Sequence, residues 1–219
     1  MQPVLCFTVR FLFDQFHGRG NADTLEWPPS PLRLYQALVA AASARWKEKE
    51  SITEHAAAAL RWLEGKPAPT IVADGFISSG APYRLYVPDN VADILAGCWS
   101  RGNEKENIAN YRTEKDIRPT HLKEDTTVHY LFPVIPDDEQ FKRYRETLIT
   151  TACSITHLGW GIDMVVGNAS VISEQEVNAM PGERWEPAED TAGTLTLRVP
   201  VPTTFEGLLR RHDEFLHRL

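Results

Sequence analysis

The residues best suited to chemistry in this sequence form the loop Phe16-His17-Gly18-Arg19-Gly20, close to the amino terminus. Glycines allow backbone N–H groups to approach a phosphate closely, and an arginine beside them can pair with it. His17 or Phe16 offers a ring on which a nucleobase could stack. The same pattern is typical of an ordinary glycine turn with a solvated arginine, so the residues alone leave both interpretations open.

A second group of cations is predicted on the polar faces of β-strands. Arg10, Arg84 and Arg198 each lie opposite an apolar face in a run of alternating residues, and Tyr86 accompanies Arg84. If these strands share one sheet, its open face carries arginines for an RNA backbone and a ring for bases. Solvated arginines on an ordinary sheet explain the pattern equally well.

Residues 101–127 are highly charged, of mixed sign and nearly devoid of apolar side chains. Such a segment cannot contribute much to a core, so it predicts a long loop or a projecting hairpin. Mixed charge is usually a sign of a solvated loop, although long insertions in compact domains are often functional. The cations of this segment are Arg101, Lys105, Arg112, Lys115, Arg118 and Lys123.

Several kinds of site have no support in the sequence. It contains no HExxH, HxH or CxxC pattern, no phosphate-binding GxxxxGK-S/T loop and no GxSxG motif, so we expect neither a metal nor a cofactor. The cysteines are Cys6, Cys98 and Cys153, which are odd in number and far apart. This spacing favours a reducing cytoplasm over a disulfide framework.

The overall charge argues against non-specific binding of nucleic acid. With 23 basic and 30 acidic residues, the net charge is −7. A nucleic-acid role therefore requires basic residues that gather on one face, or positive charge supplied by partners. No run approaches the roughly 20 apolar residues of a membrane span, so no membrane partner is expected.

The elements that position the loop are a strand over residues 4–13 and a helix that begins at Pro31. Pro28 and Pro29 hold the approach extended, Ser30 is the predicted N-cap, and Pro31 occupies the first helical position. A second helix is predicted from a capping box between Ser51 and Glu54.

The remaining chain alternates between further strands and helices. Strands are predicted at 70–78, 83–87, 128–135, 163–172 and 194–199, a short helix at 90–98, a helix capped by Asp137, a loop over 182–193 and a final helix over 203–219. The order predicts an α+β fold of one domain over residues 1–219. The simplest match is a ferredoxin-like, RNA-recognition-motif-like antiparallel sheet with helices on one face.

Three stretches together resemble a known family. "WPPSPLRLYQALVAAA" (27–42), with "FLFDQFHGRG" (11–20) and "HLGWGIDMVV" (157–166), is similar to the type I-U, or I-G, CRISPR-associated Csb-two family. Members of that family fuse a Cas-five-like half to a Cas-six-like half. The resemblance implies that this chain is the Cas-five-like half, with residues 101–127 as a projecting thumb and no Cas-six-like half after Leu219.

The same resemblance implies a function in antiviral defence. A Cas-five-like half caps the Cascade surveillance complex and grips the 5′ handle of the CRISPR RNA. The implied partners are CRISPR RNA, Cas-seven-like backbone subunits, the large subunit, a Cas-six-like half and target DNA. The expected RNA contacts are Arg10, His17, Arg19, Arg33, Arg84, Arg112, Lys115, Arg118 and Lys123, with no catalytic residue.

We expect Arg10, Arg19 and Arg33 to converge into a trough for one RNA strand. Arg33 lies in the first turn of the predicted helix, whose backbone N–H groups favour anions. Two other functions stay open. One is a metal-independent endoribonuclease that recruits His17, Tyr35 and His129 as acid or base, and the other is a ferredoxin-like protein that binds a small molecule.

Overall fold

The computed structural model describes residues 3–20, 24–48, 51–88, 112–188 and 195–217. Its centre is a five-stranded antiparallel sheet, which confirms the predicted α+β class. The strands lie side by side in the order β11 (Val165–Ile172), β1 (Val4–Phe11), β10 (Thr127–Pro133), β5 (Thr70–Ala73) and β12 (Glu183–Trp185).

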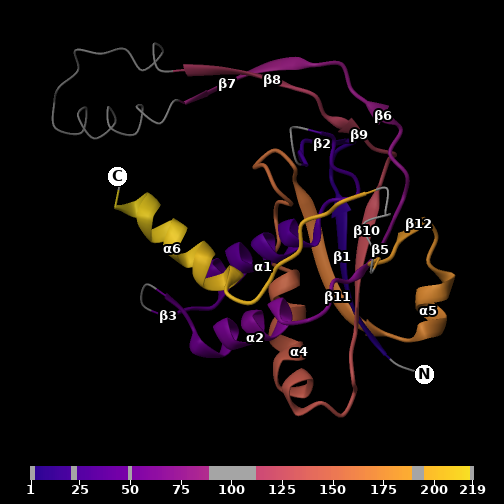
Figure 1. The fold of residues 1–219 in the computed structure, drawn as a ribbon, viewed down its shortest axis with the longest axis vertical. Coiled ribbons are helices and arrows are strands. Elements are labelled where there is room, and N and C mark those ends of the chain that lie inside the picture. Colours follow the sequence, from indigo (N-terminus) through magenta and orange to yellow (C-terminus); the bar gives the residue numbers. More distant parts are fainter. Residues whose placement is uncertain (1–2, 21–23, 49–50, 89–111, 189–194, 218–219) are drawn as a thin grey trace.

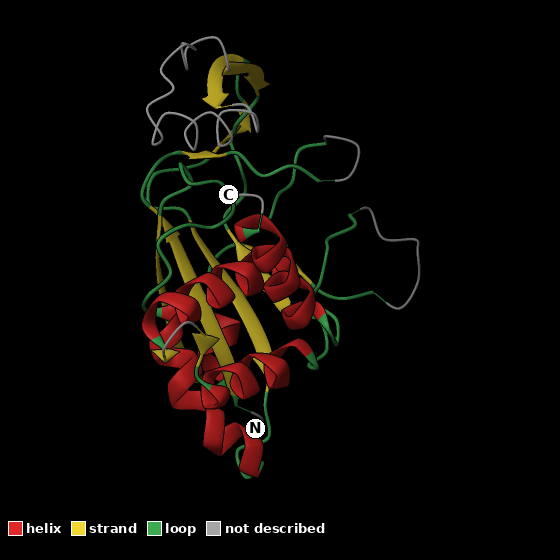
Figure 2. Cartoon of the chain, turned by 90° about the vertical axis from the view of Figure 1, so that its left-hand side faces the viewer, coloured by secondary structure: helices red, strands yellow, loops and turns green. Residues whose placement is uncertain are grey.

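Three helices cover one face of this sheet, as Figures 1 and 2 show. They are α1 (Pro31–Arg45), α2 (Glu54–Glu64) and α4 (Glu139–Ala152). The side chains of β1 that point toward them are Leu5, Phe7, Val9 and Phe11, each at most 3% exposed. Because side chains alternate along a strand, the predicted apolar face of β1 is the face that builds the core.

The other face of the sheet is partly covered by a short helix that the sequence did not predict. This helix is α5 (Glu174–Ala179), and its Val177 packs with Cys6, Val72 and Leu131 in a second small cluster. The expectation of helices on one face only is therefore wrong. The alternation of β1 explains the result, because Cys6 lies on the face opposite Phe7 and is buried there against Val177 of α5.

A two-stranded ribbon projects from one end of the molecule (Figure 1). It pairs β7 (Tyr83–Pro88) with β8 (Arg112–Ile117), from Tyr83 opposite Ile117 to Pro88 opposite Arg112. At its base, β9 (Thr120–His121) lies between β2 (Gln15–Phe16) and β6 (Ser78–Ser79). Of the projection expected over 101–127, residues 112–117 form this ribbon together with residues 83–88, whereas residues 120–121 form β9 at its base. Residues 101–111 and the predicted helix at 90–98 lie outside the described residues.

Several predicted boundaries and caps differ from the structure. Thr53 caps α2, because Ser51 belongs to β4 (Ser51–Ile52), which pairs with β3 (Lys47–Glu48). Asp138, rather than Asp137, caps α4 and accepts a hydrogen bond from the backbone N–H of Gln140. These shifts of one or two residues leave the order of the elements intact.

The chain after α5 differs more from the prediction. The predicted loop over 182–193 contains the edge strand β12, and residues 195–199 run outside any sheet although a strand was predicted there. They lead into α6 (Thr204–Leu216), which points away from the body in Figure 1. In the described part of the chain, no helix is long and apolar enough to cross a membrane.

Glu64 at the end of α2 fixes the start of α6. It is 5% exposed and accepts hydrogen bonds from the backbone N–H groups of Thr203 and Phe205, at 3.1 and 2.8 Å. Phe205 is buried beneath the guanidinium of Arg61, which also pairs with Glu206 at 2.7 Å. A carboxylate at a helix N-terminus is favourable, so this end of α6 is held to the body.

Candidate nucleic-acid interface

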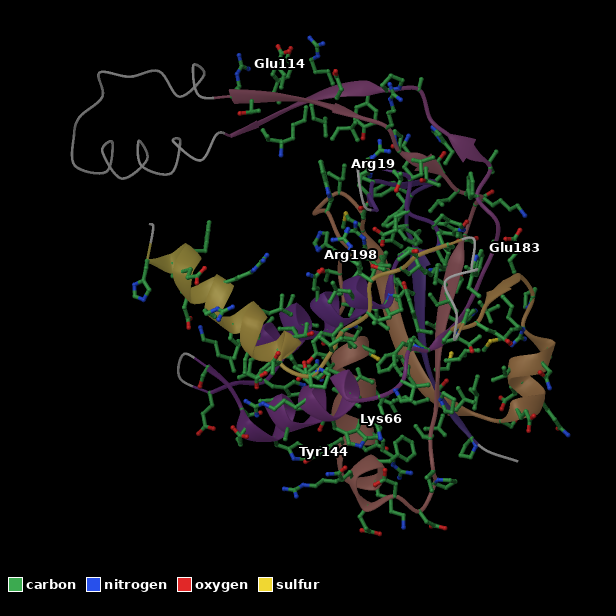
Figure 3. All side chains as sticks on the ribbon, viewed as in Figure 1. Arg19, Lys66, Glu114, Tyr144, Glu183 and Arg198 are labelled. Atoms are coloured by element: carbon green, nitrogen blue, oxygen red, sulfur yellow. The ribbon has the colours of Figure 1, made fainter. Side chains whose placement is uncertain are left out.

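Five segments meet where the ribbon joins the sheet. They are the loop after β1, the start of α1, the ribbon base, the turn at residues 157–163 and the extended segment 195–199. In Figure 3, Arg19 and Arg198 lie at this end of the molecule, below the ribbon, whereas Lys66 and Tyr144 lie at the opposite end. The contacts below show that this end gathers arginines from distant parts of the sequence.

The carbonyl oxygen of Arg19 is the centre of this gathering. Nη2 of Arg33 and Nη2 of Arg198 both donate hydrogen bonds to it, at 3.1 and 3.0 Å. The side chain of Arg19 reaches the ribbon, where Nη2 donates to the carbonyl oxygen of Arg118 at 2.7 Å. The tertiary structure thus joins Arg19 to Arg33, to Arg198 and to the backbone of Arg118. Arg198 had been considered for an RNA backbone only as part of a shared sheet face, and it was not among the expected RNA contacts of the family resemblance.

Arg33 is the member of this group whose charge is already neutralised. Its Nε and Nη2 donate to the two carboxylate oxygens of Glu26, at 2.9 and 2.8 Å, and Glu26 is only 3% exposed. Burial acts to raise the pKa of Glu26, but the hydrogen bonds from Arg33 and Ser30 prevail and the pKa is lowered. We therefore assign Arg33 a positioning role, because a paired and largely buried guanidinium has little left to offer a phosphate.

The first turn of α1 also differs from the anion site that was expected. Ser30 is the N-cap residue, as predicted, but its side chain makes no capping hydrogen bond, and Pro31 has no N–H. The backbone N–H of Leu32 donates to the carbonyl oxygen of Arg198 at 3.0 Å, and that of Arg33 donates to the carbonyl oxygen of Ser30 at 2.9 Å. These N–H groups are used within the protein, so the expectation that they receive an anion is wrong.

Arg10 does not take part in the predicted trough. It lies on the face of the sheet opposite to Phe11 and the helices, and its Nη1 forms an exposed ion pair with Asp125 at 3.4 Å. Lys123 belongs to the same turn as Asp125, since its carbonyl oxygen accepts from the backbone N–H of Thr126. The expected convergence of Arg10 with Arg19 and Arg33 is therefore wrong.

The prediction that Arg10, Arg84 and Arg198 share one open sheet face is also wrong. Arg84 lies in β7, whose partner is β8, and not in the five-stranded sheet of β1. It forms ion pairs with Glu114 at 3.0 Å and with Asp116 at 3.3 Å. Arg112 lies at the far end of the same ribbon, with its guanidinium 5.3 Å from the ring centre of Tyr86.

The cations of the ribbon base and of segment 195–199 differ from Arg10, Arg33 and Arg84, each of which is paired with a carboxylate. Lys115, Arg118 and Arg198 are exposed, and within the described residues none of the three forms an ion pair. Together with Arg19, which is partly exposed, we call them the cation cluster. The cluster combines residues from the first loop, from β8 and the position after it, and from the segment after β12, and two long-range hydrogen bonds join Arg19 to Arg118 and to Arg198.

His17 is buried rather than presented to a ligand. Its side chain is 4% exposed, its Nδ1 donates to Oδ1 of Asp163 at 2.6 Å, and its backbone N–H donates to the same oxygen at 3.0 Å. Nε2 is 2.5 Å from the hydroxyl of Tyr83, which donates to it in this arrangement. A base cannot stack on this ring, so the expected stacking role of His17 is wrong.

Asp163, Tyr83 and Trp160 are the neighbours of His17 that the sequence did not assign to the site. Burial, and then the charge of Asp163, raise the pKa of Tyr83, so its hydroxyl is a donor near neutral pH. The His17 ring lies nearly parallel to the Trp160 indole, at 25° and 6.4 Å between ring centres. The sequence signal for Trp160 and Asp163 was the stretch "HLGWGID" at 157–163, quoted above for its family resemblance, whereas Tyr83 lay in the strand predicted at 83–87.

The three residues considered for acid–base catalysis do not meet. Tyr35 is buried in the core and donates to the carbonyl oxygen of Leu60 and to Glu64, and burial and the Glu64 charge raise its pKa. His129 lies on the other face of the sheet, 3.0 Å from the hydroxyl of Thr8, and burial lowers its pKa. With His17 in a third place, the described residues do not assemble the expected acid–base group.

The structure also bears on the metal and small-molecule alternatives. Among the described residues, no group of three or more His, Cys, Asp or Glu side chains is placed to hold a metal ion. A groove of about 490 Å³ lies between segment 195–199 and the end of β12, with Ile71, Trp185 and Leu197 in its walls. Its charged lining residues are Arg184 and Glu186.

Comparison with known proteins identifies the family. A crystal structure of a CRISPR protein from Archaeoglobus fulgidus is similar over 78% of this chain, with 14% sequence identity and a TM-score of 0.40, and this chain spans 64% of that protein's length. No curated protein matches the chain. The family model described as "CRISPR-associated protein, GSU0054 family" matches residues 7–219, so this chain belongs to the GSU0054 family of CRISPR-associated proteins.

Proposed function

We propose that this protein is an RNA-binding subunit of a type I CRISPR Cascade surveillance complex in antiviral defence. It would hold the 5′ handle of the CRISPR RNA and cap the backbone of the complex in the cytoplasm. In this proposal it is the Cas-five-like half of the type I-U, or I-G, Csb-two family. Its partners are Cas-seven-like backbone subunits, the large subunit, a Cas-six-like half and, finally, target DNA.

The observation that carries the proposal is the cation cluster. Lys115, Arg118 and Arg198 are exposed and form no ion pair among the described residues, although the chain as a whole carries a net charge of −7. Exposed guanidinium and ammonium groups are suited to the phosphates of a nucleic-acid backbone. The cluster replaces the predicted trough of Arg10, Arg19 and Arg33, of which Arg19 alone is retained.

The arrangement of the elements supports a ferredoxin-like core. The succession β1, α1 and α2, β5, β10, α4, β11 follows the β-α-β-β-α-β pattern, and the four strands lie in the order β11-β1-β10-β5. The ribbon of β7 and β8 then corresponds to the thumb. Because Lys115 belongs to this ribbon and Arg118 directly follows it, the proposal places the RNA where the thumb meets the sheet.

Charge reversal tests the proposal directly. We expect the double variant Arg118→Glu and Arg198→Glu to weaken binding of single-stranded CRISPR repeat RNA by at least about tenfold. The slope of log affinity against log salt should fall by about 0.7 for each lost phosphate contact. Fluorescence anisotropy with labelled repeat RNA over a series of salt concentrations measures both quantities.

The matched control reverses two arginines at the opposite end of the molecule. Arg143 and Arg145 are exposed on α4, beside Tyr144, which Figure 3 shows far from the ribbon. Arg143→Glu with Arg145→Glu changes the net charge by the same amount and should leave affinity within about twofold, since screening weakens distant charges. Equal effects of the two double variants, or no effect of either, would contradict the proposal. We expect the RNA to be recovered uncut in the presence of EDTA.

A further inference from the structure

We propose that Trp160 is a stacking platform for one unpaired nucleobase of the bound RNA, with Lys115 beside it for the adjoining phosphate. This inference rests on the proposed function, because it requires RNA to lie across the ribbon base. It assigns a base contact to a residue outside the cation cluster.

The turn that carries Trp160 is held rigid by one buried residue. Asp163 is 1% exposed, and its backbone N–H donates to the carbonyl oxygen of Trp160 at 2.9 Å. Its Oδ2 accepts from the backbone N–H of Trp160 at 3.3 Å, and its carbonyl oxygen accepts from Leu158 at 3.0 Å. A side chain on a fixed turn loses little conformational entropy on binding, which favours it as a preformed contact.

The imidazole ring of His17 lies stacked next to the Trp160 indole. The two rings lie 25° from parallel, and His17 is itself fixed by Asp163 and by the hydroxyl of Tyr83. His17 is only 4% exposed, whereas Trp160 is partly exposed. The aromatic surface that was expected from His17 is therefore presented to solvent by Trp160, which lies next to it.

The surroundings of the indole are partly open to solvent and supply a cation. Trp160 is partly exposed, and a Cβ atom placed on the next residue, Gly161, would meet no heavy atom within 4 Å outside its chain neighbours. The ammonium group of Lys115 lies over the Trp160 ring system, 5.9 Å from its centre, so a base that stacks on this face would displace the lysine side chain toward the adjoining phosphate. An aromatic face beside cations is the combination with which proteins hold single-stranded nucleic acid, because every base has a π-face and every nucleotide a phosphate.

The test compares RNA with and without bases. The probes are a single-stranded oligoadenylate and a ribose-phosphate oligomer of the same length that lacks all bases. We expect Trp160→Leu, which keeps an apolar cover over His17 but removes the aromatic face, to weaken oligoadenylate binding by about tenfold. Binding of the abasic oligomer should change by less than about twofold, and Trp160→Phe should retain most of the affinity for oligoadenylate.

A purely structural role of Trp160 predicts a different result. If the indole only seals the Asp163–His17 pair from water, Trp160→Leu will affect both probes equally, and that outcome overturns the inference. Thermal unfolding of each variant shows whether the fold is retained, and Trp46→Leu, at the C-terminal end of α1, serves as a matched tryptophan control. The salt slope should be unchanged in Trp160→Leu, because stacking releases no counterions.

The outcomes separate this inference from the proposed function. If reversal of Arg118 and Arg198 weakens binding but Trp160→Leu binds oligoadenylate as the wild type does, only the platform is wrong. If the wild-type protein binds neither probe, or if the arginine reversals have no effect, the proposed function fails and the platform fails with it.

Discussion

Arg33 and Glu26 form a bidentate ion pair, at 2.9 and 2.8 Å, that joins the loop before α1 to the first turn of that helix. Arg33 also donates to the carbonyl oxygen of Arg19, so this pair fixes the loop that belongs to the cation cluster. Arg33, which the sequence predicted as an RNA contact, thus holds the loop of Arg19 in place.

Replacing Glu26 should destabilise the protein. Glu26→Gln leaves the guanidinium of Arg33 largely buried without a counter-charge, and breaking such a pair costs about 3 kcal/mol. Urea unfolding at neutral pH measures the loss. The control Glu139→Gln removes an exposed carboxylate from the start of α4 and should stay within about 0.5 kcal/mol. A value near zero for Glu26→Gln would show that the pair does not hold the loop.

The same carboxyl group predicts a loss of stability in acid. The pKa of Glu26 is lowered in the folded protein from an ordinary value of 4.5, because the hydrogen bonds from Arg33 and Ser30 outweigh the opposing effect of burial. Its contribution to stability is fully present above about pH 4.5 and is lost as the pH falls through the lowered folded value. Urea midpoints over this range should fall more steeply in the wild type than in Glu26→Gln, and parallel curves would contradict the assignment.

Two glycines on either side of Trp160 provide a matched pair of substitutions. Gly159 has φ +114°, and an added Cβ would lie 2.9 Å from Nη1 of Arg33, so Gly159→Ala should cost about 1–3 kcal/mol. Gly161→Ala meets nothing within 4 Å and should be neutral or slightly stabilising. Thermal unfolding measures the melting temperature of each variant, and we expect that of Gly159→Ala to be the lower. Equal melting temperatures would mean that the turn adapts and is not held rigid.

The stability of the protein should depend on the negative charge of Asp163. It accepts two hydrogen bonds from His17 and one from Trp160, and Asp163→Asn places an amide donor among these donors. We expect a loss of about 2 kcal/mol in urea unfolding. We also expect faster amide exchange at Tyr83, because the histidine that holds the ribbon base loses its partner. Asp116→Asn on the exposed ribbon is the control, and similar effects of both changes would contradict a special role for Asp163.

Helix α6 should depend on one buried phenylalanine. Phe205 is 1% exposed whereas Phe215, nearly three turns further along, is 47% exposed. Phe205→Ala should therefore destabilise the protein by about 3–5 kcal/mol, and Phe215→Ala by no more than about 0.5 kcal/mol. Urea unfolding followed by circular dichroism measures both. If Phe205→Ala were as mild as Phe215→Ala, the attachment of α6 would rest on Glu64 and Arg61 alone.

Predictions from local sequence pattern were most accurate where a strand or helix buries apolar side chains at regular spacing. The alternation of Leu5, Phe7 and Val9 predicted the strand and its buried face, and Pro31 marked the first residue of α1. Local pattern failed at 195–199, the described part of the strand predicted at 194–199, where Leu195, Leu197 and Val199 alternate as in a strand. There the chain passes over the body without a β-partner, and alternation alone cannot supply one.

The sequence by itself determined the α+β class, most of the elements and, through its family signature, the association with CRISPR. Only the tertiary structure decided which of the described cations are exposed and unpaired, and so available to bind a phosphate. Glu26 neutralises Arg33, Asp125 pairs with Arg10, and His17 lies buried against Asp163. Each of these outcomes depends on distances between side chains, and all but the Glu26–Arg33 pair join residues more than 100 positions apart. Charge and aromatic character are properties of single residues, whereas exposure and pairing arise from contacts that form only when the chain folds.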